Sequence, residues 1–304
     1  MSLLYIGQQI TIFGGYLMII AGIFGNIMNI IIFTTVRTYR TNPGTFYFLS
    51  ASINNLIYII ENLPFRILSV GYNIDFTIES TFWCKFRNYQ YVMLGPISYT
   101  CICLATIDQY FVSSLNPHIR HMSNIKWSHR ILIIIIIIWC LHAIPVFLYV
   151  NNVPPNSICI NANAIYRVYM TIFGVVFLCA IPVGISLIFG YLTYQNIQQT
   201  KTLVEQHADR QIIRMTFVQI LLMIIADVPY TVFSIYLSIT NQRLKSYDQQ
   251  VNEYVIMQFA MLISYICFVA NFYMFWISSS RFRQTAKKKL FCWKKESIVF
   301  PSHT

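Results

Sequence analysis

Long apolar runs recur along this chain, and each is about as long as a helix that crosses a lipid bilayer. A helix needs roughly 20 apolar residues to span the hydrocarbon core, and the stretch ILIIIIIIWCLHAIPVFLYV at 131–150 is one example. In water its β-branched residues would favour an aggregating strand. In lipid an isolated segment must satisfy its backbone hydrogen bonds internally, and only a helix does so. The runs therefore predict transmembrane helices.

The composition of the 304-residue chain supports this interpretation. Hydrophobic residues make up 57% of it and charged residues only 10%, whereas soluble domains carry about 25% charged residues. We predict an all-α membrane protein in one domain over residues 1–304, with a seven-helix bundle and a short C-terminal amphipathic helix at about 280–291. The expected transmembrane helices are 8–36, 46–70, 83–112, 131–150, 166–194, 212–239 and 254–279.

Basic residues gather on one side of these segments. The loops near 37–45, 113–130 and 195–211, the adjoining helix ends and the C-terminus hold 15 of the 21 lysines and arginines. The positive-inside rule makes that side cytosolic. Topology and anionic inner-leaflet lipid then explain the net charge of +11 better than nucleic acid does. Because the start MSLLYIGQQ is uncharged, we expect an extracellular N-terminus, no cleaved signal peptide and a multi-pass protein of the plasma membrane.

Two of the eight cysteines are expected on the oxidising side of the membrane. Cys84 lies at the outer mouth of the third expected helix, and Cys159 lies in the outer loop NNVPPNSICINANA. We predict a disulfide between them, and two free thiols are the alternative. Closing a loop of this length stabilises a fold by about 4 kcal/mol in the chain-entropy model.

Several motifs occur in a fixed register along the expected helices. A Gly-Asn pair stands in the first helix, and 24 residues separate the outer cysteine of the third helix from an acid at its inner end. A tryptophan lies in the fourth helix, the fifth and sixth contain prolines, and NFYMFWISSSRFR ends the seventh. In these motifs, and over nearly its whole length, the chain resembles the rhodopsin-like (class A) G protein-coupled receptors. The matching residues are Gly25, Asn26, Cys84, Asp108, Trp139, Pro182 and Pro229.

The resemblance implies a receptor that binds an extracellular ligand and shifts its helices to engage a heterotrimeric G protein, by a change in the populations of bundle states. The residues show no paired-carboxylate site in a soluble domain, no metal-spaced His or Cys set and no phosphate-binding glycine loop. We therefore expect no enzyme, no metal and no cofactor. Two alternatives are a non-signalling ligand-binding or receptor-partner protein and, less well supported, a small transporter, since inverted repeats are not visible.

The inner end of the third helix departs from the family pattern. In the family, the acid pairs with a neighbouring arginine that reaches toward an acid on the sixth helix. Here Asp108 and Tyr110 remain, but Gln109 occupies the arginine position, and Asp209 stands at the sixth-helix position. Two acids are expected to face a neutral amide, which donates hydrogen bonds without the ion pair of an arginine. A polar helix end that meets water is the alternative.

Further departures fall at other positions where the family changes conformation. At the position of the aspartate in the family's sodium site, this chain has Asn55. We expect an uncharged hydrogen-bond cluster of Asn26, Asn55 and Asn271 instead. Phe272 and Phe275 replace the proline and tyrosine of the Asn-Pro-x-x-Tyr motif. The expected G protein or switch residues are Asp108, Gln109, Tyr110, Asp209, Asn271 and Phe275.

Ionisable residues at membrane depth are costly and are functional candidates by default. Asp227 replaces the aromatic residue two positions before the sixth-helix proline, and Glu61 lies within the second helix. Each is expected either to serve the ligand cavity or to tie helices together by hydrogen bonds. Arg66, about one turn farther out than Glu61, is expected to reach the membrane interface.

The outer cavity residues restrict the ligand. Tyr91 stands where aminergic receptors carry their acid, which disfavours a biogenic amine. Tyr265 stands where opsins carry a lysine, so no amine is available for a retinal Schiff base. We expect an amidated or aromatic peptide, such as a neuropeptide, although tyrosines also form interfacial belts without binding a ligand. The expected ligand-binding residues are Glu61, Arg87, Gln90, Tyr91, Asp227, Gln258 and Tyr265.

The segment SSSRFRQTAKKKLFCWKKES resembles the surface-lying helix of the family. We expect Phe282, Leu290 and Phe291 to enter the membrane interface while the lysines 287–289 meet anionic lipid. Cys292 is expected to be palmitoylated, with an unmodified thiol as the alternative.

Overall fold

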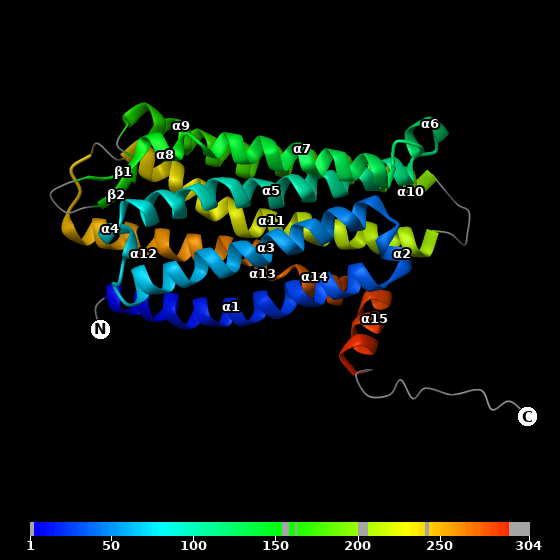
Figure 1. Cartoon of the computed structure of the whole chain (residues 1–304), viewed down its shortest axis with the longest axis horizontal. Coiled ribbons are helices and arrows are strands. Elements are labelled where there is room, and N and C mark those ends of the chain that lie inside the picture. Colours follow the sequence, from blue (N-terminus) through cyan, green and yellow to red (C-terminus); the bar gives the residue numbers. More distant parts are fainter. Residues whose placement is uncertain (1–2, 154–157, 162, 200–205, 241–242, 292–304) are drawn as a thin grey trace, which may run out of the picture.

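The computed structural model describes residues 3–153, 158–161, 163–199, 206–240 and 243–291. Within these residues the chain forms long helices that lie side by side, together with one two-stranded hairpin (Figure 1). The long helices are α1 (Leu3–Thr35), α3 (Pro43–Arg66), α5 (Thr81–Ser113), α7 (Ile125–Ala143), α9 (Ala164–Val175), α10 (Ile181–Gln199), α11 (Gln206–Thr240) and α12 (Tyr247–Ser264).

Short elements mark the two ends of the bundle. The hairpin of β1 (Val150–Val153) and β2 (Ile158–Asn161) lies with the N-terminus at one end, here called the hairpin end (Figure 1). The opposite end, here called the α15 end, holds α2 (Arg37–Arg40), α6 (Pro117–Arg120) and α15 (Ser280–Phe291). The remaining short helices are α4 (Phe76–Glu79), α8 (Val146–Tyr149), α13 (Ile266–Val269) and α14 (Asn271–Ser278).

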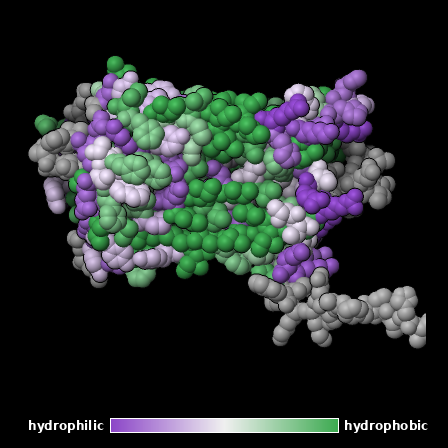
Figure 2. Space-filling model, in the orientation of Figure 1, coloured by the Kyte–Doolittle hydropathy of each residue, from purple (hydrophilic) through white to green (hydrophobic). Residues whose placement is uncertain are grey.

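Six of the described helical segments are long and apolar enough to cross a membrane. They are Leu3–Thr35, Thr81–Ser113, Ile125–Tyr149, Ala164–Gln199, Arg214–Thr240 and Tyr247–Val269. Figure 2 shows the corresponding band of hydrophobic residues across the middle of the bundle, with hydrophilic residues toward both ends. The protein is therefore an all-helical, multi-pass membrane protein. The second expected span, 46–70, falls in α3, which is not among the six.

Polar residues that face the bundle interior explain the lower hydropathy of α3. Asn54 and Asn55 are buried and bond to α5. The Asn54 amide donates to the Leu94 carbonyl at 2.7 Å, and the Ser98 hydroxyl donates to Asn55 Oδ1 at 2.5 Å. On its other side α3 packs closely on α1, where a Cβ at Gly22 would lie 2.6 Å from Ile59 Cδ1. The polar residues of α3 thus lie within the protein.

The helices are interrupted at three places. A π-helical turn at Ile67–Gly71 follows Pro64, and another at Val176–Ala180 precedes Pro182. Pro182 has no N–H to donate to the carbonyl four residues earlier. The backbone hydrogen bonds of the helix therefore change from the α-helical to the π-helical pattern at this turn. The last membrane segment, residues 247–278 and here called the seventh segment, is divided into α12, α13 and α14, although it contains no proline.

The break in the seventh segment is stabilised by α1. Across the described chain, the Phe272 N–H does not bond to the Phe268 carbonyl, and that carbonyl accepts a hydrogen bond from Asn26 Nδ2 at 3.0 Å instead. Asn271 Oδ1 accepts from Gln219 Nε2 at 2.6 Å. The expectation that Asn26, Asn55 and Asn271 bond to one another was wrong, because each has partners on a different helix.

The hairpin is anchored to α5. Its strands pair antiparallel, with Asn152 opposite Cys159, and a disulfide joins Cys159 to Cys84 across a Cα–Cα distance of 5.7 Å. Asn88, one turn below Cys84, donates to Cys159 Sγ at 3.4 Å. The predicted disulfide is confirmed.

α15 follows directly after α14 at the end of the bundle. Phe282 was expected in the membrane interface, but it is 0% exposed and packs on the rings of Phe33 and Phe275, each at 5.8 Å. The lysines 287–289 and Leu290 are exposed. Cys292 and the side chain of Phe291 lie outside the described residues, so the palmitoylation site stays a prediction.

Candidate functional site

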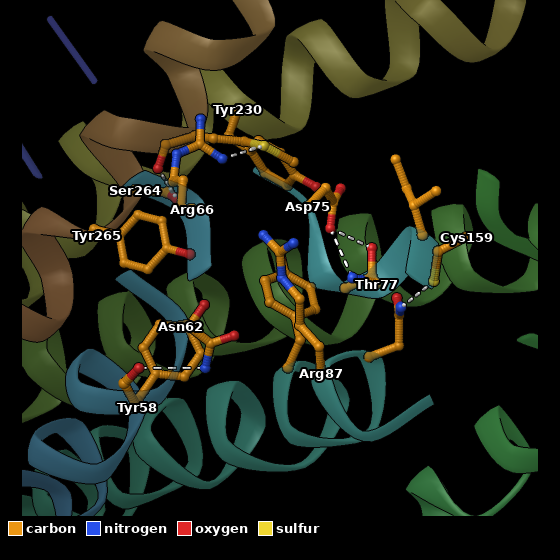
Figure 3. A pocket seen from close by; sticks show the side chains of 14 residues that line it. Tyr58, Asn62, Arg66, Asp75, Thr77, Arg87, Cys159, Tyr230, Ser264 and Tyr265 are labelled. Carbon is orange, nitrogen blue, oxygen red and sulfur yellow. Dashed lines mark hydrogen bonds between the residues drawn. The ribbon is translucent and has the colours of Figure 1, made fainter. Parts of the chain in front are cut away.

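A cavity of about 340 Å³ opens at the hairpin end of the bundle. Its walls come from α3, α4, α5, β2, α11 and the seventh segment, and Figure 3 shows their side chains converging on one space. We call it the outer cavity. The residues used below are Tyr58, Asn62, Arg66, Asp75, Arg87, Tyr91, Tyr230 and Tyr265.

Aromatic rings form the inner wall of the outer cavity. Tyr58 stacks on Phe268 at 4.1 Å between centroids and lies 5.7 Å from Tyr265 and 6.4 Å from Tyr91. Such ring pairs contribute about 0.5–1.5 kcal/mol beyond their buried area. The rings connect α3, α5 and the seventh segment around the space that a ligand would enter.

A smaller space of about 30 Å³, here called the inner chamber, lies deeper and shares Tyr58, Tyr91 and Tyr230 with the outer cavity. Its lining includes Asp227, which is 5% exposed. The Tyr99 hydroxyl donates to Asp227 Oδ1 at 2.7 Å.

A second contact to Asp227 comes from the seventh segment. Cys267 Sγ lies 3.5 Å from Asp227 Oδ2. Asp227 therefore connects α11 to α5 through Tyr99 and to α13 through Cys267. The same side chain thus lines the inner chamber and ties α11 to its neighbours.

Arg66 is a charged cavity residue that the sequence reasoning placed elsewhere. It was expected to reach the membrane interface, but it is 4% exposed and lines the outer cavity. Its guanidinium donates to the carbonyl and to Oε1 of Gln258 at 2.8 and 2.6 Å, and its Nη1 lies 3.0 Å from Met261 Sδ. Tyr58, Asn62 and Arg66 stand four residues apart, a spacing that places all three on one helix face. That spacing was the available signal.

Arg87 and Asp75 complete the charged part of the outer cavity. Figure 3 shows the Arg87 guanidinium extending into the space near Asp75 and Arg66. The Arg87 Cζ lies 5.9 Å from the Phe65 ring centroid. Asp75 caps α4, because its Oδ1 accepts from the Thr77 N–H at 2.9 Å and from the Thr77 hydroxyl at 2.6 Å.

The expected ligand-binding residues do not all lie in one place. Arg87, Tyr91 and Tyr265 line the outer cavity, and Asp227 and Tyr91 line the inner chamber. Gln258 does not line the outer cavity itself but holds the Arg66 guanidinium.

Glu61 and Gln90 line neither of these spaces. Glu61 Oε2 and Gln90 Oε1 are buried, and neither has a hydrogen-bond partner among the described residues.

Two of the residues expected to form a switch at the α15 end, Asp108 and Gln109, lie beside the first turn of α3. Asp108 Oδ1 accepts from the Ser123 hydroxyl at 2.7 Å. Gln109 is 2% exposed and packs on the first turn of α3, where a Cβ added to Gly44 would overlap its Nε2. The side chain of Asp209 lies outside the described residues. The amide at 109 is therefore enclosed against α3.

Two other expected switch residues, Tyr110 and Phe275, pack on aromatic rings. Tyr110 packs on the Phe189 ring at 5.5 Å, and Phe275 is buried against the Phe48 ring at 5.1 Å. Phe275 cannot provide the hydroxyl that the family's tyrosine carries, so its contribution at this end is packing.

Comparison with known proteins identifies the family. No curated protein matches the chain. The family model of the 7 transmembrane receptor (rhodopsin family) matches residues 25–289, which is 265 of the 304 residues. This range contains the disulfide, the outer cavity, the inner chamber and the Asp-Gln-Tyr triplet. The chain therefore belongs to the rhodopsin family of seven-transmembrane receptors, the G protein-coupled receptors.

Proposed function

We propose that this protein binds an extracellular peptide, of the neuropeptide kind, in the outer cavity and signals to a heterotrimeric G protein. The observation that carries the proposal is the outer cavity itself, which has aromatic and charged walls beneath a hairpin fixed by the Cys84–Cys159 disulfide. Concave sites with apolar walls and a few convergent polar groups are the usual form of a ligand site. The known role of the family as receptors supports this assignment.

The proposed orientation places the hairpin end outside the cell, in the plasma membrane. It rests on the basic residues of α2, α6 and α15, which gather at the opposite end, as cytosolic segments do. In this arrangement α3 is the second transmembrane helix and brings the six apolar spans to seven, and its polar side chains are shielded by α1 and α5. The lysines of α15 then meet anionic inner-leaflet lipid, and Cys292, the next residue along the chain after α15, is the proposed palmitoylation site.

The proposed signal passes from the inner chamber through Asp227. A ligand that reaches this acid competes with Tyr99 and Cys267, whose contacts tie α11 to α5 and α13. A ligand shifts an equilibrium only through its differential affinity for the two states. The exchange of these contacts for ligand contacts is such a difference, so Asp227 biases how α11 packs in the bundle.

A library of short synthetic peptides tests the proposal on cells that express the full chain at the surface, read by second messengers and by arrestin recruitment. Gly95 lines the inner chamber, whereas Gly184 does not. A Cβ added to either glycine would meet no atom within 4 Å, so both alanine variants fit the fold without a clash. Gly95→Ala should lower the potency of active peptides, and Gly184→Ala is the matched control. If no peptide gives a signal at verified surface expression, the signalling proposal fails.

One observation favours a second function, a binding protein that does not signal. Gln109, in place of the family's arginine, is buried against α3 rather than presented at the α15 end. A purified chain that binds a peptide but recruits no G protein would support this function. Gln109→Arg then provides a positive control, because signalling gained by this single change would show that the glutamine is what prevents coupling.

A further inference from the structure

The Arg66 guanidinium is buried without a counter-charge. Its hydrogen bonds go to neutral groups of Gln258 and Met261, and its Nε is buried with no hydrogen-bond partner among the described residues. No described carboxylate lies within 4 Å of it, since the ion pair among the described residues joins Lys245 to Glu253. An unpaired charge is costly to bury. Among the described residues, the Arg66 guanidinium therefore lacks an anionic partner.

A second guanidinium faces the same space. Arg87 lines the outer cavity with Arg66, is half-buried, and forms no ion pair or hydrogen bond with any described residue beyond its approach to the Phe65 ring. Two like charges in one cavity repel each other and raise the local concentration of anions. A ligand anion between them would relieve this repulsion.

The acid of the outer cavity leaves this positive charge uncompensated. Asp75 uses its Oδ1 to cap α4 through Thr77, and it lies beyond 4 Å of both guanidinium groups. Two arginines against one aspartate leave the lining of the outer cavity with a formal charge of +1. The acid Asp227 lies in the inner chamber and does not line the outer cavity.

We propose that the outer cavity binds a carboxylate of the ligand between Arg66 and Arg87. This inference rests on the proposed function of the outer cavity as the ligand site. A guanidinium matches a carboxylate in a bidentate geometry and forms hydrogen bonds about twice as strong as neutral ones. The tyrosines beside it provide aromatic surface. The ligand class is therefore an aromatic acid, such as a peptide with a free C-terminus or an acidic side chain, and a peptide amidated at that group is excluded.

Matched probes test the charge directly on the purified full chain in lipid nanodiscs. N-acetyl-tyrosine and N-acetyl-tyrosinamide have the same ring and differ in the carboxylate. The acid should raise the unfolding temperature with increasing concentration, and the amide should need about tenfold more for the same shift. N-acetyl-glutamyl-tyrosinamide carries its carboxylate on a side chain, and a larger shift with it assigns the anion to an acidic residue. Equal shifts from acid and amide, or no shift from either acid, overturn the proposal.

Variants then locate the binding. Arg66→Met and Arg87→Met should each abolish most of the acid's shift, whereas Arg167→Met, an exposed arginine outside the cavity, should leave it unchanged. Asp75→Asn keeps the helix cap but removes the negative charge, so it should strengthen the acid's effect several-fold. If Arg66→Met does not fold, Arg87→Met and Asp75→Asn still decide the matter. An undiminished shift in Arg87→Met together with no gain in Asp75→Asn refutes the site.

The probe assay is independent of signalling. A charge-selective shift in a chain that recruits no G protein would support the carboxylate site and count against the proposed signalling function. If the chain signals and its active peptides bind equally well as amides, the signalling function is supported and the carboxylate site is refuted.

Discussion

Removing the Tyr99 hydroxyl should weaken the connection between α5 and α11. Tyr99→Phe leaves the ring in place but takes away the donor that lies 2.7 Å from Asp227 Oδ1. Asp227 is 5% exposed, so its carboxylate depends mainly on partners within the bundle. The variant therefore creates an under-bonded acid in the bundle interior.

The size of the effect follows from two opposing considerations. A buried polar group that loses its partner costs about 1–3 kcal/mol. Interhelical hydrogen bonds in membranes measure lower, about 0.6 kcal/mol on average and 1.7 at most, because the unfolded chain in lipid also finds partners. For an acid that retains its Cys267 contact we expect a loss of about 1–2 kcal/mol. Soluble domains of 150–250 residues lose roughly 2–4 °C per kcal/mol.

The measurement is a double-mutant cycle on the purified chain, read by thermal unfolding. Asp227→Leu in the Tyr99→Phe background removes the under-bonded acid, so the double variant should lose less than the sum of the single ones. Tyr273→Phe is the matched control, because its hydroxyl donates only to a neutral carbonyl, that of Ala21 at 3.0 Å. Additive losses, or an equal loss in Tyr273→Phe, would refute the reasoning.

Three further predictions concern other parts of the bundle. Cys84→Ser and Cys159→Ser should lower surface expression or ligand binding equally, and the double variant should be no worse than either, as antibody staining of intact cells can show. Gly44→Ala should displace the Gln109 amide and change basal output at matched surface levels, and unchanged output would separate that contact from signalling. Glu253→Gln should lower the unfolding temperature, since it removes the ion pair with the lysine beyond α11, and high salt should reduce the difference.

The sequence was most informative where the type of a residue and its expected environment together allow few structural roles. Cys84 and Cys159 fall on the oxidising side of the predicted topology, where two thiols favour a disulfide. Asp227 could be singled out because an acid inside an apolar run is costly. Runs of apolar residues likewise indicated where helices stand, although the polar α3 lies below the hydropathy of the other spans.

The remaining features depend on how a helix is rotated about its axis and on what lies opposite it. Arg66 turns inward because it shares a face with Tyr58 and Asn62, and its partner Gln258 is 192 residues away in the chain. Gln109 packs on α3 only because Gly44 leaves room for its amide. Neither contact follows from local pattern, because each requires two helices to be positioned first.

The broken seventh segment differs in kind from a break enforced by proline. A proline lacks its N–H in every conformation, so the gap that it creates is permanent. Here Phe272 retains its N–H, and the Phe268 carbonyl is occupied by the Asn26 amide instead. Donor and acceptor are therefore both present at this break, whereas a proline would supply no donor. The seventh segment thus keeps both backbone groups that a continuous helix would need, and a side chain of the first helix holds one of them.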